Sequence, residues 1–283
     1  MRILFFSPMS IHYGGGGEYW LYHVTSRLVK LGHVIYVLAS SYNPLRKKSN
    51  IISMLKKENV KYAEVSYLKP MMGAPIISLK HLRNIGKIVK KYDLLYVIST
   101  PPNDLMWYLY KKVKLLGMQK VIYGYHAFQS LERIIEKSYF ALQSKFLKDV
   151  DAIHVLNNRL YNLFNATIGN KTEIFYIPNG VDTQKFRFQG IKCRHSEFTV
   201  LYSGRLSYDK GFDIFIEILK KLSQKREWKN MKIIIMGRGK LEPLALNFAK
   251  KHENVTFMGY VEYEKIPLIY NRAHLFLIPS RTE

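Results

Sequence analysis

The stretch Phe198–Asp213, F-T-V-L-Y-S-G-R-L-S-Y-D-K-G-F-D, decides the fold. Its apolar, β-branched and aromatic run 199–202 predicts a short buried strand. The run ends at Gly204, where the missing side chain lets the backbone turn sharply or approach a ligand. Arg205 and Lys210 follow, and an amphipathic helical pattern comes next. Strand, glycine turn, two cations and a helix N-terminus predict an anion site, most naturally for a diphosphate; the plainer alternative is a loop with two solvated cations.

Alternating strand and helix patterns extend in both directions from this stretch. Strands are predicted at 3–6, 33–39, 60–65, 94–98, 121–125, 152–156, 173–177, 232–236, 255–258 and 274–278, with helical patterns between most of them. Residues 183–197 lose this periodicity, and a linker placed there divides the chain into domains 1–188 and 189–283. Two consecutive alternating halves predict two α/β domains with parallel sheets that face one another.

The chain opens on a strand–loop–helix–strand unit with a glycine-rich turn at 14–17. Such a unit is the usual opening of a nucleotide-binding α/β sheet. The glycines match neither the P-loop pattern nor G-x-G-x-x-G. Two interpretations stay open: a flexible loop, or a loop whose backbone N–H groups bind phosphate at the start of the helix predicted from Glu18.

Basic residues dominate, most strongly in the first half. The formal net charge is +23, and residues 1–150 carry 23 Lys and Arg against 8 Asp and Glu. Such an excess favours anionic partners: phosphorylated ligands, acidic membrane surfaces or nucleic acid. The range 75–91 predicts a helix with a basic face, which is either an ordinary solvated face or a docking face for anionic lipid, extended by 46–48 and 56–57.

Several classes of protein are disfavoured by what the chain contains. The single cysteine, Cys193, excludes an internal disulfide framework and fits a reducing compartment. Metal-binding spacings such as C-x-x-C and H-E-x-x-H do not occur. The N-terminal apolar run is too short for a signal peptide, and no apolar stretch approaches the roughly 20 residues that span a bilayer. We therefore expect a cytoplasmic protein, one that can still lie on the cytoplasmic face of a membrane.

A series of short motifs, in this order and spacing, resembles glycosyltransferase family 4. The motifs are the glycine loop at 14–17, His126 after a strand, D-A-I-H-V-L at 151–156, I-P-N-G-V-D at 177–182, S-G-R-L-S-Y-D-K-G at 203–211, I-M-G-R-G at 235–239, N-V-T-F-M-G-Y-V at 254–261 and L-I-P-S-R-T-E at 277–283. The resemblance covers essentially the whole chain and is densest from Asp151 onward. It implies two facing Rossmann-like domains, the GT-B fold, with the first on the acceptor side and the second, incomplete, binding a nucleotide sugar.

The resemblance also implies the activity. A hexosyl unit would move from a nucleotide diphosphate sugar to a hydroxyl acceptor, glycan or lipid-linked, with retention of configuration and without a required metal or other cofactor. Gly204, Arg205 and Lys210 match the clamp for the donor diphosphate, where fixed cations stabilise the charge that grows as the sugar–phosphate bond breaks.

Other positions are assigned by the same resemblance. His126 matches a histidine beside the donor sugar, and it follows a strand at the edge where open α/β sheets bind ligands. Gly15 or Gly16 would lie where donor and acceptor meet; four consecutive glycines leave the register open. Gly237 and Arg238 would line the base or ribose pocket, with a tight turn as the plainer alternative. Two further histidines, at 154 and 274, lie within predicted strands and are expected to be packing residues.

The last residue departs from the family pattern. Glu283 matches the first of two glutamates that the family places eight positions apart, and the chain ends there. The first glutamate is expected to contact sugar hydroxyls, and the second, by resemblance, the donor ribose. From this the 283-residue chain is expected to bind donor weakly and to turn over poorly or not at all.

Three rival functions remain. A non-catalytic module that binds sugar or nucleotide would show binding without turnover. A nucleotide-sugar epimerase of similar fold is a second enzyme hypothesis. A nucleic-acid binder is suggested by the charge alone; the aromatic residues fall mostly at predicted core positions and no recognition motif occurs, so nucleic acid is not an expected partner.

Overall fold

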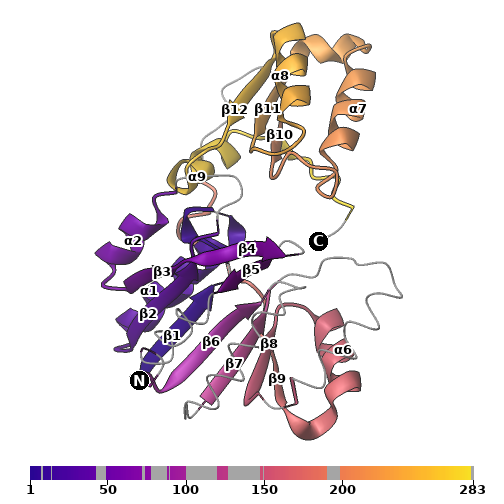
Figure 1. The fold of residues 1–283 in the computed structure, drawn as a ribbon. Helices are drawn as coiled ribbons and strands as arrows, with labels where there is room; N and C mark the ends of the chain where they lie inside the picture. The colour runs from indigo at the N-terminus through magenta and orange to yellow at the C-terminus, as the bar shows by residue number, and fades with distance from the viewer. Residues whose placement is uncertain are drawn as a thin grey trace. The chain divides into compact units, whose positions relative to one another are not determined.

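The structure is a computed structural model that describes residues 1–7, 9–13, 15–42, 49–71, 74–77, 88, 90–99, 120–126, 147–148, 150–189 and 198–281. The chain divides into two compact units, Met1–Asn179 and Gly180–Glu283 (Figure 1). Each is an α/β unit built on a parallel sheet, as expected. The domain boundary predicted at 188/189 adjoins residues outside the described ranges and stays a prediction.

Unit 1 (Met1–Asn179) contains a seven-stranded sheet in the order β3-β2-β1-β6-β7-β8-β9. Its strands are β1 (Arg2–Ser7), β2 (Val34–Ser40), β3 (Lys61–Val65), β6 (Leu94–Ser99), β7 (Lys120–Tyr125), β8 (Ala152–Val155) and β9 (Glu173–Tyr176). Every neighbouring pair is parallel, so the carboxyl ends of the strands share one edge. The strands predicted from the sequence in this half are confirmed, within one or two residues at their ends.

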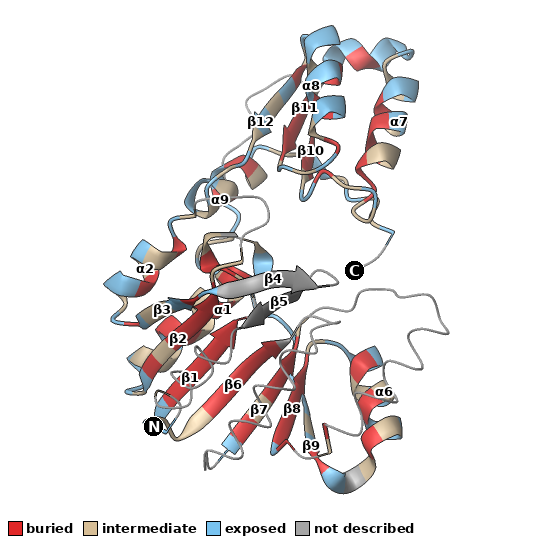
Figure 2. Ribbon diagram, in the orientation of Figure 1, coloured by how far each residue is buried: buried red, intermediate tan, exposed pale blue. Residues whose placement is uncertain are grey.

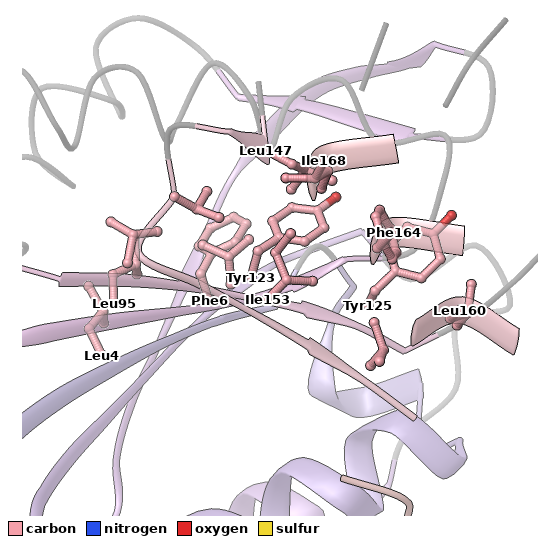
Figure 3. Close-up of a cluster of buried hydrophobic side chains, with 14 of the residues drawn as sticks. Leu4, Phe6, Leu95, Tyr123, Tyr125, Leu147, Ile153, Leu160, Phe164 and Ile168 are labelled. Carbon is pink, nitrogen blue, oxygen red and sulfur yellow. The ribbon is translucent and has the colours of Figure 1, made fainter. Parts of the chain in front are cut away.

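Side chains that alternate along each strand build two cores, one on each face of this sheet. One face packs Leu4 and Leu38 with residues of the helix α6 (Asn158–Ile168), in the cluster drawn in Figure 3. The other face packs Phe5 and Val37 against α1 (Gly16–Lys30) and α2 (Ile51–Lys57). Figure 2 shows the result: the inner strands of the sheet, such as β1, β6 and β8, are buried along most of their length. Because both faces are covered, the strands are nearly continuous apolar runs rather than alternating ones.

Residues 67–71 and 74–77 form two paired strands, so the helix predicted to begin at Pro75 is wrong for its first turn. The strands β4 (Tyr67–Met71) and β5 (Ala74–Ile77) pair antiparallel, with Pro70 opposite Pro75. The two isoleucines after Pro75 are β-branched and favour extended backbone, and proline is tolerated in a two-stranded ribbon, where every strand is an edge. Most of the helix predicted at 75–91 lies outside the described residues, and so do most of the helical patterns predicted between the strands at 94–98, 121–125 and 152–156.

Unit 2 (Gly180–Glu283) contains a four-stranded parallel sheet in the order β12-β11-β10-β13. Its strands are β10 (Phe198–Ser203), β11 (Met231–Met236), β12 (Val255–Gly259) and β13 (Leu275–Phe276), and its α-helices are α7 (Phe212–Leu222), α8 (Glu242–Lys251) and α9 (Ile266–Tyr270). Short 3₁₀ turns are η1 (Ile11–Tyr13) and η2 (Gly169–Lys171) in unit 1, and η3 (Arg226–Asn230) and η4 (Tyr263–Lys265) in unit 2. The alternation predicted after residue 198 is confirmed.

The main core of unit 2 lies between its sheet and α7 and α8. Tyr202 of β10 packs its ring against Phe212 and Phe215 of α7, each pair with centroids 5.0 Å apart. Leu219 continues the same buried face of the helix. None of the helices in the described part of the chain combines the length and apolar character that crossing a bilayer requires.

Leu219→Ala should destabilise unit 2 by about 2–5 kcal/mol, because it removes buried methyl groups and leaves a cavity. The matched control is Leu246→Ala on α8. Leu219 is fully buried and Leu246 is 43% exposed, so the control should cost less than about 1 kcal/mol. Urea unfolding followed by circular dichroism measures both; equal losses would contradict the assigned core.

Candidate functional site

In unit 2, the loops that follow β10 and β11 are bonded backbone to backbone. The N–H of Gly204 donates to the carbonyl of Met236 at 3.2 Å, and that of Leu206 donates to Arg238 at 3.1 Å. The N–H of Leu241 then donates to Leu206 at 2.9 Å. The two loops therefore form one continuous surface at the carboxyl edge of the sheet, which is where open α/β sheets bind ligands.

This contact requires glycine at two positions. Gly237 has φ +136°, and a Cβ atom there would lie 1.8 Å from the carbonyl oxygen of Gly204. A Cβ at Gly239 would lie 2.4 Å from the carbonyl oxygen of Leu206. Residues 237–239 are thus packed closely against the loop that follows β10, and the tight turn proposed there as the plainer alternative stays a prediction. Whether Gly237 and Arg238 also line a base or ribose pocket stays a prediction.

Arg205 and Lys210 lie on this surface, just ahead of α7. Gly211 forms the N-cap of α7 in the left-handed conformation, φ 64°, so the helix N-terminus directly follows Lys210. The hydroxyl of buried Tyr202 lies 2.8 Å from the carbonyl oxygen of Arg205 and 3.2 Å from that of Lys210. These contacts anchor the loop to the core of unit 2. The guanidinium of Arg205 is exposed and pairs with Asp209 at 2.8 Å. An exposed pair of this kind is weak, so an anionic ligand can compete for Arg205.

Arg281 is a residue of this surface that the sequence analysis missed. Its guanidinium donates two parallel hydrogen bonds to the carboxylate of Asp213, both 2.7 Å, and a third to the carbonyl of Tyr208 at 2.6 Å. The hydrogen bonds from Arg281 lower the pKa of Asp213 below its usual range. The segment after β13 is thereby fastened to the loop that carries Arg205. Glu283 lies outside the described residues, and its role stays a prediction.

In unit 1, three polar side chains form a connected group near the carboxyl ends of β6, β7 and β8. The hydroxyl of Tyr96 lies 2.9 Å from Nε2 of His126 and 2.5 Å from Nδ1 of His154. Nε2 of His154 lies 2.8 Å from the carbonyl oxygen of Ile177. His154 was expected to be a packing residue. It is buried in a strand as predicted, and it is also linked through Tyr96 to the candidate site residue His126, which the sequence analysis did not foresee.

The ring of Trp20, in the first turns of α1, covers this group. Its centroid lies 4.1 Å from that of His126, edge to face, and 5.7 Å from that of Tyr96. Gly124 makes room beneath, because a Cβ there would lie 2.2 Å from the hydroxyl of Tyr96. His126 is therefore held between α1 and the sheet. Burial lowers its pKa to about 3, with a further contribution from His154, so its imidazole is neutral at pH 7.

The glycine loop meets α1 in a way that opposes a phosphate. The helix begins at Gly16 rather than at Glu18, and Gly15 is its N-cap. The carboxylate of Glu18 accepts a hydrogen bond from the N–H of Gly15 at 2.7 Å, so a negative charge already occupies one of the donors expected to bind phosphate. Side chains at Gly16 and Gly17 would meet no atom within 4 Å. An uncharged ligand, such as a sugar or an alcohol, suits this loop better than an anion.

His274 accepts a hydrogen bond from the N–H of Thr199 through Nδ1 at 3.0 Å and stacks on Phe198, in keeping with a packing role. Within the ranges that the structure describes, no three His, Cys, Asp or Glu side chains gather as metal ligands would. The expectation of no required cofactor stays a prediction.

The fold is the two-unit GT-B architecture. The chain belongs to glycosyltransferase family 4: the model of that family matches residues 14–185, and a model described as "Glycosyl transferases group 1" matches 183–283. The resemblance inferred from the sequence motifs is confirmed.

Individual relatives are distant. A phosphatidylinositol N-acetylglucosaminyltransferase subunit of Arabidopsis thaliana is 22% identical over 293 residues, covering 100% of this chain and 63% of the relative. Its human counterpart is 21% identical over 282 residues, covering 95% of this chain and 55% of its own length. The chain thus spans about 60% of these curated relatives.

Solved structures share the fold. Pneumococcal O-GlcNAc transferase GtfA, in complex with UDP and GlcNAc, matches with a TM-score of 0.68 at 13% identity, covering 100% of this chain and 80% of that one. Anabaena HepE, in complex with UDP and glucose, matches with a TM-score of 0.67 at 15% identity, covering 98% and 74%.

Gly237→Ala should destabilise unit 2 by at least about 2 kcal/mol, because the new Cβ would meet the carbonyl of Gly204 and because φ is positive. Gly180→Ala is the matched control, since a Cβ there meets nothing within 4 Å. Thermal unfolding monitored by circular dichroism compares the two; a Gly237→Ala chain as stable as the control would refute the close approach of the two loops.

Proposed function

We propose that the chain transfers a hexosyl unit from a nucleotide diphosphate sugar to a hydroxyl acceptor, with retention of anomeric configuration. The observation that carries this proposal is the loop of unit 2 on which Arg205 and Lys210 precede the N-terminus of α7. Two cations beside the positive end of a helix favour a diphosphate at this place.

The chemistry follows from where charge develops. The bond between the anomeric carbon and the diphosphate oxygen breaks, the acceptor oxygen bonds to the same carbon on the same face, and the acceptor proton passes to the departing diphosphate. Negative charge on the diphosphate grows during this step. Arg205 and Lys210 would therefore bind the transition state more strongly than the ground state, which is the condition for catalysis.

His126, Trp20 and the glycine loop of unit 1 would bind the uncharged partners, the sugar and the acceptor. The aromatic ring of Trp20 offers an apolar surface, and His126 offers a polar one. Glu18 supports this division, because its carboxylate repels an anion from the loop at Gly15 and Gly16. The relatives' names support the same activity: one is part of a phosphatidylinositol N-acetylglucosaminyltransferase, and another, 25% identical over 53% of this chain, is a glycogen synthase.

Arg205→Ala should weaken binding of a nucleoside diphosphate by about 1.5–3 kcal/mol, or about ten- to hundredfold in Kd, because a charge-assisted hydrogen bond is lost. Calorimetry with UDP, GDP and ADP on folded protein measures this. Arg226→Ala, which removes an exposed arginine elsewhere in unit 2, should leave the affinity unchanged. An Arg205→Ala chain that binds as tightly as the wild type would remove Arg205 from the site.

A release assay separates the rival functions. The 283-residue chain and a form extended beyond Glu283 by a family-like tail are each incubated with UDP-, GDP- and ADP-sugars and candidate acceptors, and free nucleoside diphosphate is measured. A transferase releases diphosphate only when an acceptor is present. An epimerase changes the sugar without release, and a binding module does neither.

We further propose that unit 1 approaches an anionic membrane on the cytoplasmic face, where a lipid-linked acceptor would be available. Lys56 and Lys57 end α2, and Lys90 and Lys91 lie exposed in a turn. Each cation near an anionic surface contributes about 1 kcal/mol.

Co-sedimentation with neutral and anionic vesicles tests this. Binding should require anionic lipid and should fall as salt is raised, because the attraction is screened. Charge reversal at Lys56 and Lys57 should weaken it more than the same change at Lys250 and Lys251 of α8. Binding that ignores lipid charge would contradict the proposal.

A further inference from the structure

The polar group around His126 is a chain of hydrogen bonds that ends on a backbone carbonyl. The carbonyl oxygen of Ile177 contacts Nε2 of His154, Nδ1 of His154 contacts the hydroxyl of Tyr96, and that hydroxyl contacts Nε2 of His126. Tyr96 and His154 are each 8% exposed, and no step of the proposed function uses either of them.

The carbonyl oxygen of Ile177 determines which atom donates and which accepts in each of these hydrogen bonds. A carbonyl oxygen only accepts, so Nε2 of His154 carries a hydrogen. His154 is buried and its pKa is lowered by that burial, so it is neutral and its Nδ1 is an acceptor. The Tyr96 hydroxyl therefore donates to His154, and its oxygen accepts the hydrogen on Nε2 of His126.

We propose that Tyr96 and His154 are positioning residues, which hold His126 as the neutral tautomer with its hydrogen on Nε2 and thereby present Nδ1 as a hydrogen-bond acceptor. Resting on the proposed function, this makes the ligand group at His126 a hydroxyl of the sugar or of the acceptor. A hydroxyl can donate to Nδ1, whereas the lone pair on Nδ1 repels a phosphate or carboxylate oxygen. Among the residues that the structure describes, no other group hydrogen-bonds to His126.

The surroundings keep this arrangement in place. Trp20 lies edge to face with His126 and excludes water from one side. Gly124 pairs with His154 in neighbouring strands and leaves the space that the Tyr96 hydroxyl fills. The groups that face His126 from α1, β6 and β8 are thus an indole, a phenol and a second imidazole. None of these three is a carboxylate that would favour the charged imidazolium.

Imidazole ¹⁵N NMR at pH 7 tests the proposal on the full 283-residue chain. His126 is assigned by the signals that His126→Gln removes. The wild type should show a neutral ring with its hydrogen on Nε2. Tyr96→Phe removes the acceptor for that hydrogen and should give a mixture of tautomers. In His154→Phe the Tyr96 hydroxyl loses its acceptor and can donate to Nε2 of His126 instead. The hydrogen of the His126 ring should then move to Nδ1.

Tyr36→Phe is the control, because it deletes a tyrosine hydroxyl on the opposite face of the same sheet and should leave His126 unchanged. A cationic His126, a hydrogen on Nδ1 in the wild type, or a tautomer that neither variant changes would overturn the proposal. Variants are compared only after their folded state is verified by circular dichroism.

A binding arm tests the ligand class. Tyr96→Phe and His154→Phe should each weaken the binding of a nucleotide sugar about three- to tenfold in Kd, the range for one neutral hydrogen bond. The affinity for the free nucleoside diphosphate should not change. Equal losses for sugar and diphosphate would overturn the assignment of a hydroxyl to Nδ1. Failure of the wild type to bind any nucleotide sugar would instead refute the proposed function, while the NMR result would still decide the tautomer.

Discussion

The parallel pairing of β1 with β6 is the constraint on which unit 1 depends. From β1 the chain builds outward through β2 and β3, and it then returns to add β6 on the other side of β1, with Ile3 opposite Leu94. The strand order therefore reverses between β1 and β6, and open α/β sheets bind ligands at such a switch point, outside the carboxyl ends of their strands. Trp20 follows β1 and His126 follows β7, and their ring centroids lie 4.1 Å apart.

The sheet of unit 2 shows the same reversal of strand order, with four strands in place of seven. β10 lies between β11 and β13, so the chain again departs on one side and returns on the other. Arg205 follows β10 and Arg281 follows β13. The ion pair between Arg281 and Asp213 joins the segment after β13 to the start of α7, two segments that are 68 residues apart in sequence. In both units, the polar side chains of interest are thus placed by strand order rather than by local sequence.

The sequence predicted the strands well because buried parallel strands are short apolar runs with clear ends. It also located the loop of Arg205 and Lys210, since glycine turns and cations are visible locally. It failed at Pro75, where the partner strand that makes the segment extended lies only a few residues upstream and carries its own proline. The interactions of Arg281, Tyr96 and His154 were missed because their partners lie 23 to 73 residues away, and no pattern along the chain records that distance.

The close contact between Gly124 and Tyr96 has a consequence for how the family can vary. A Cβ at position 124 would lie 2.2 Å from the Tyr96 hydroxyl, so any larger residue at 124 excludes a tyrosine in this rotamer at 96. The two positions lie on adjacent strands, yet they are 28 residues apart along the chain. Among homologues, tyrosine at 96 should therefore occur together with glycine at 124, and sequences that lose the glycine should lose the hydroxyl as well.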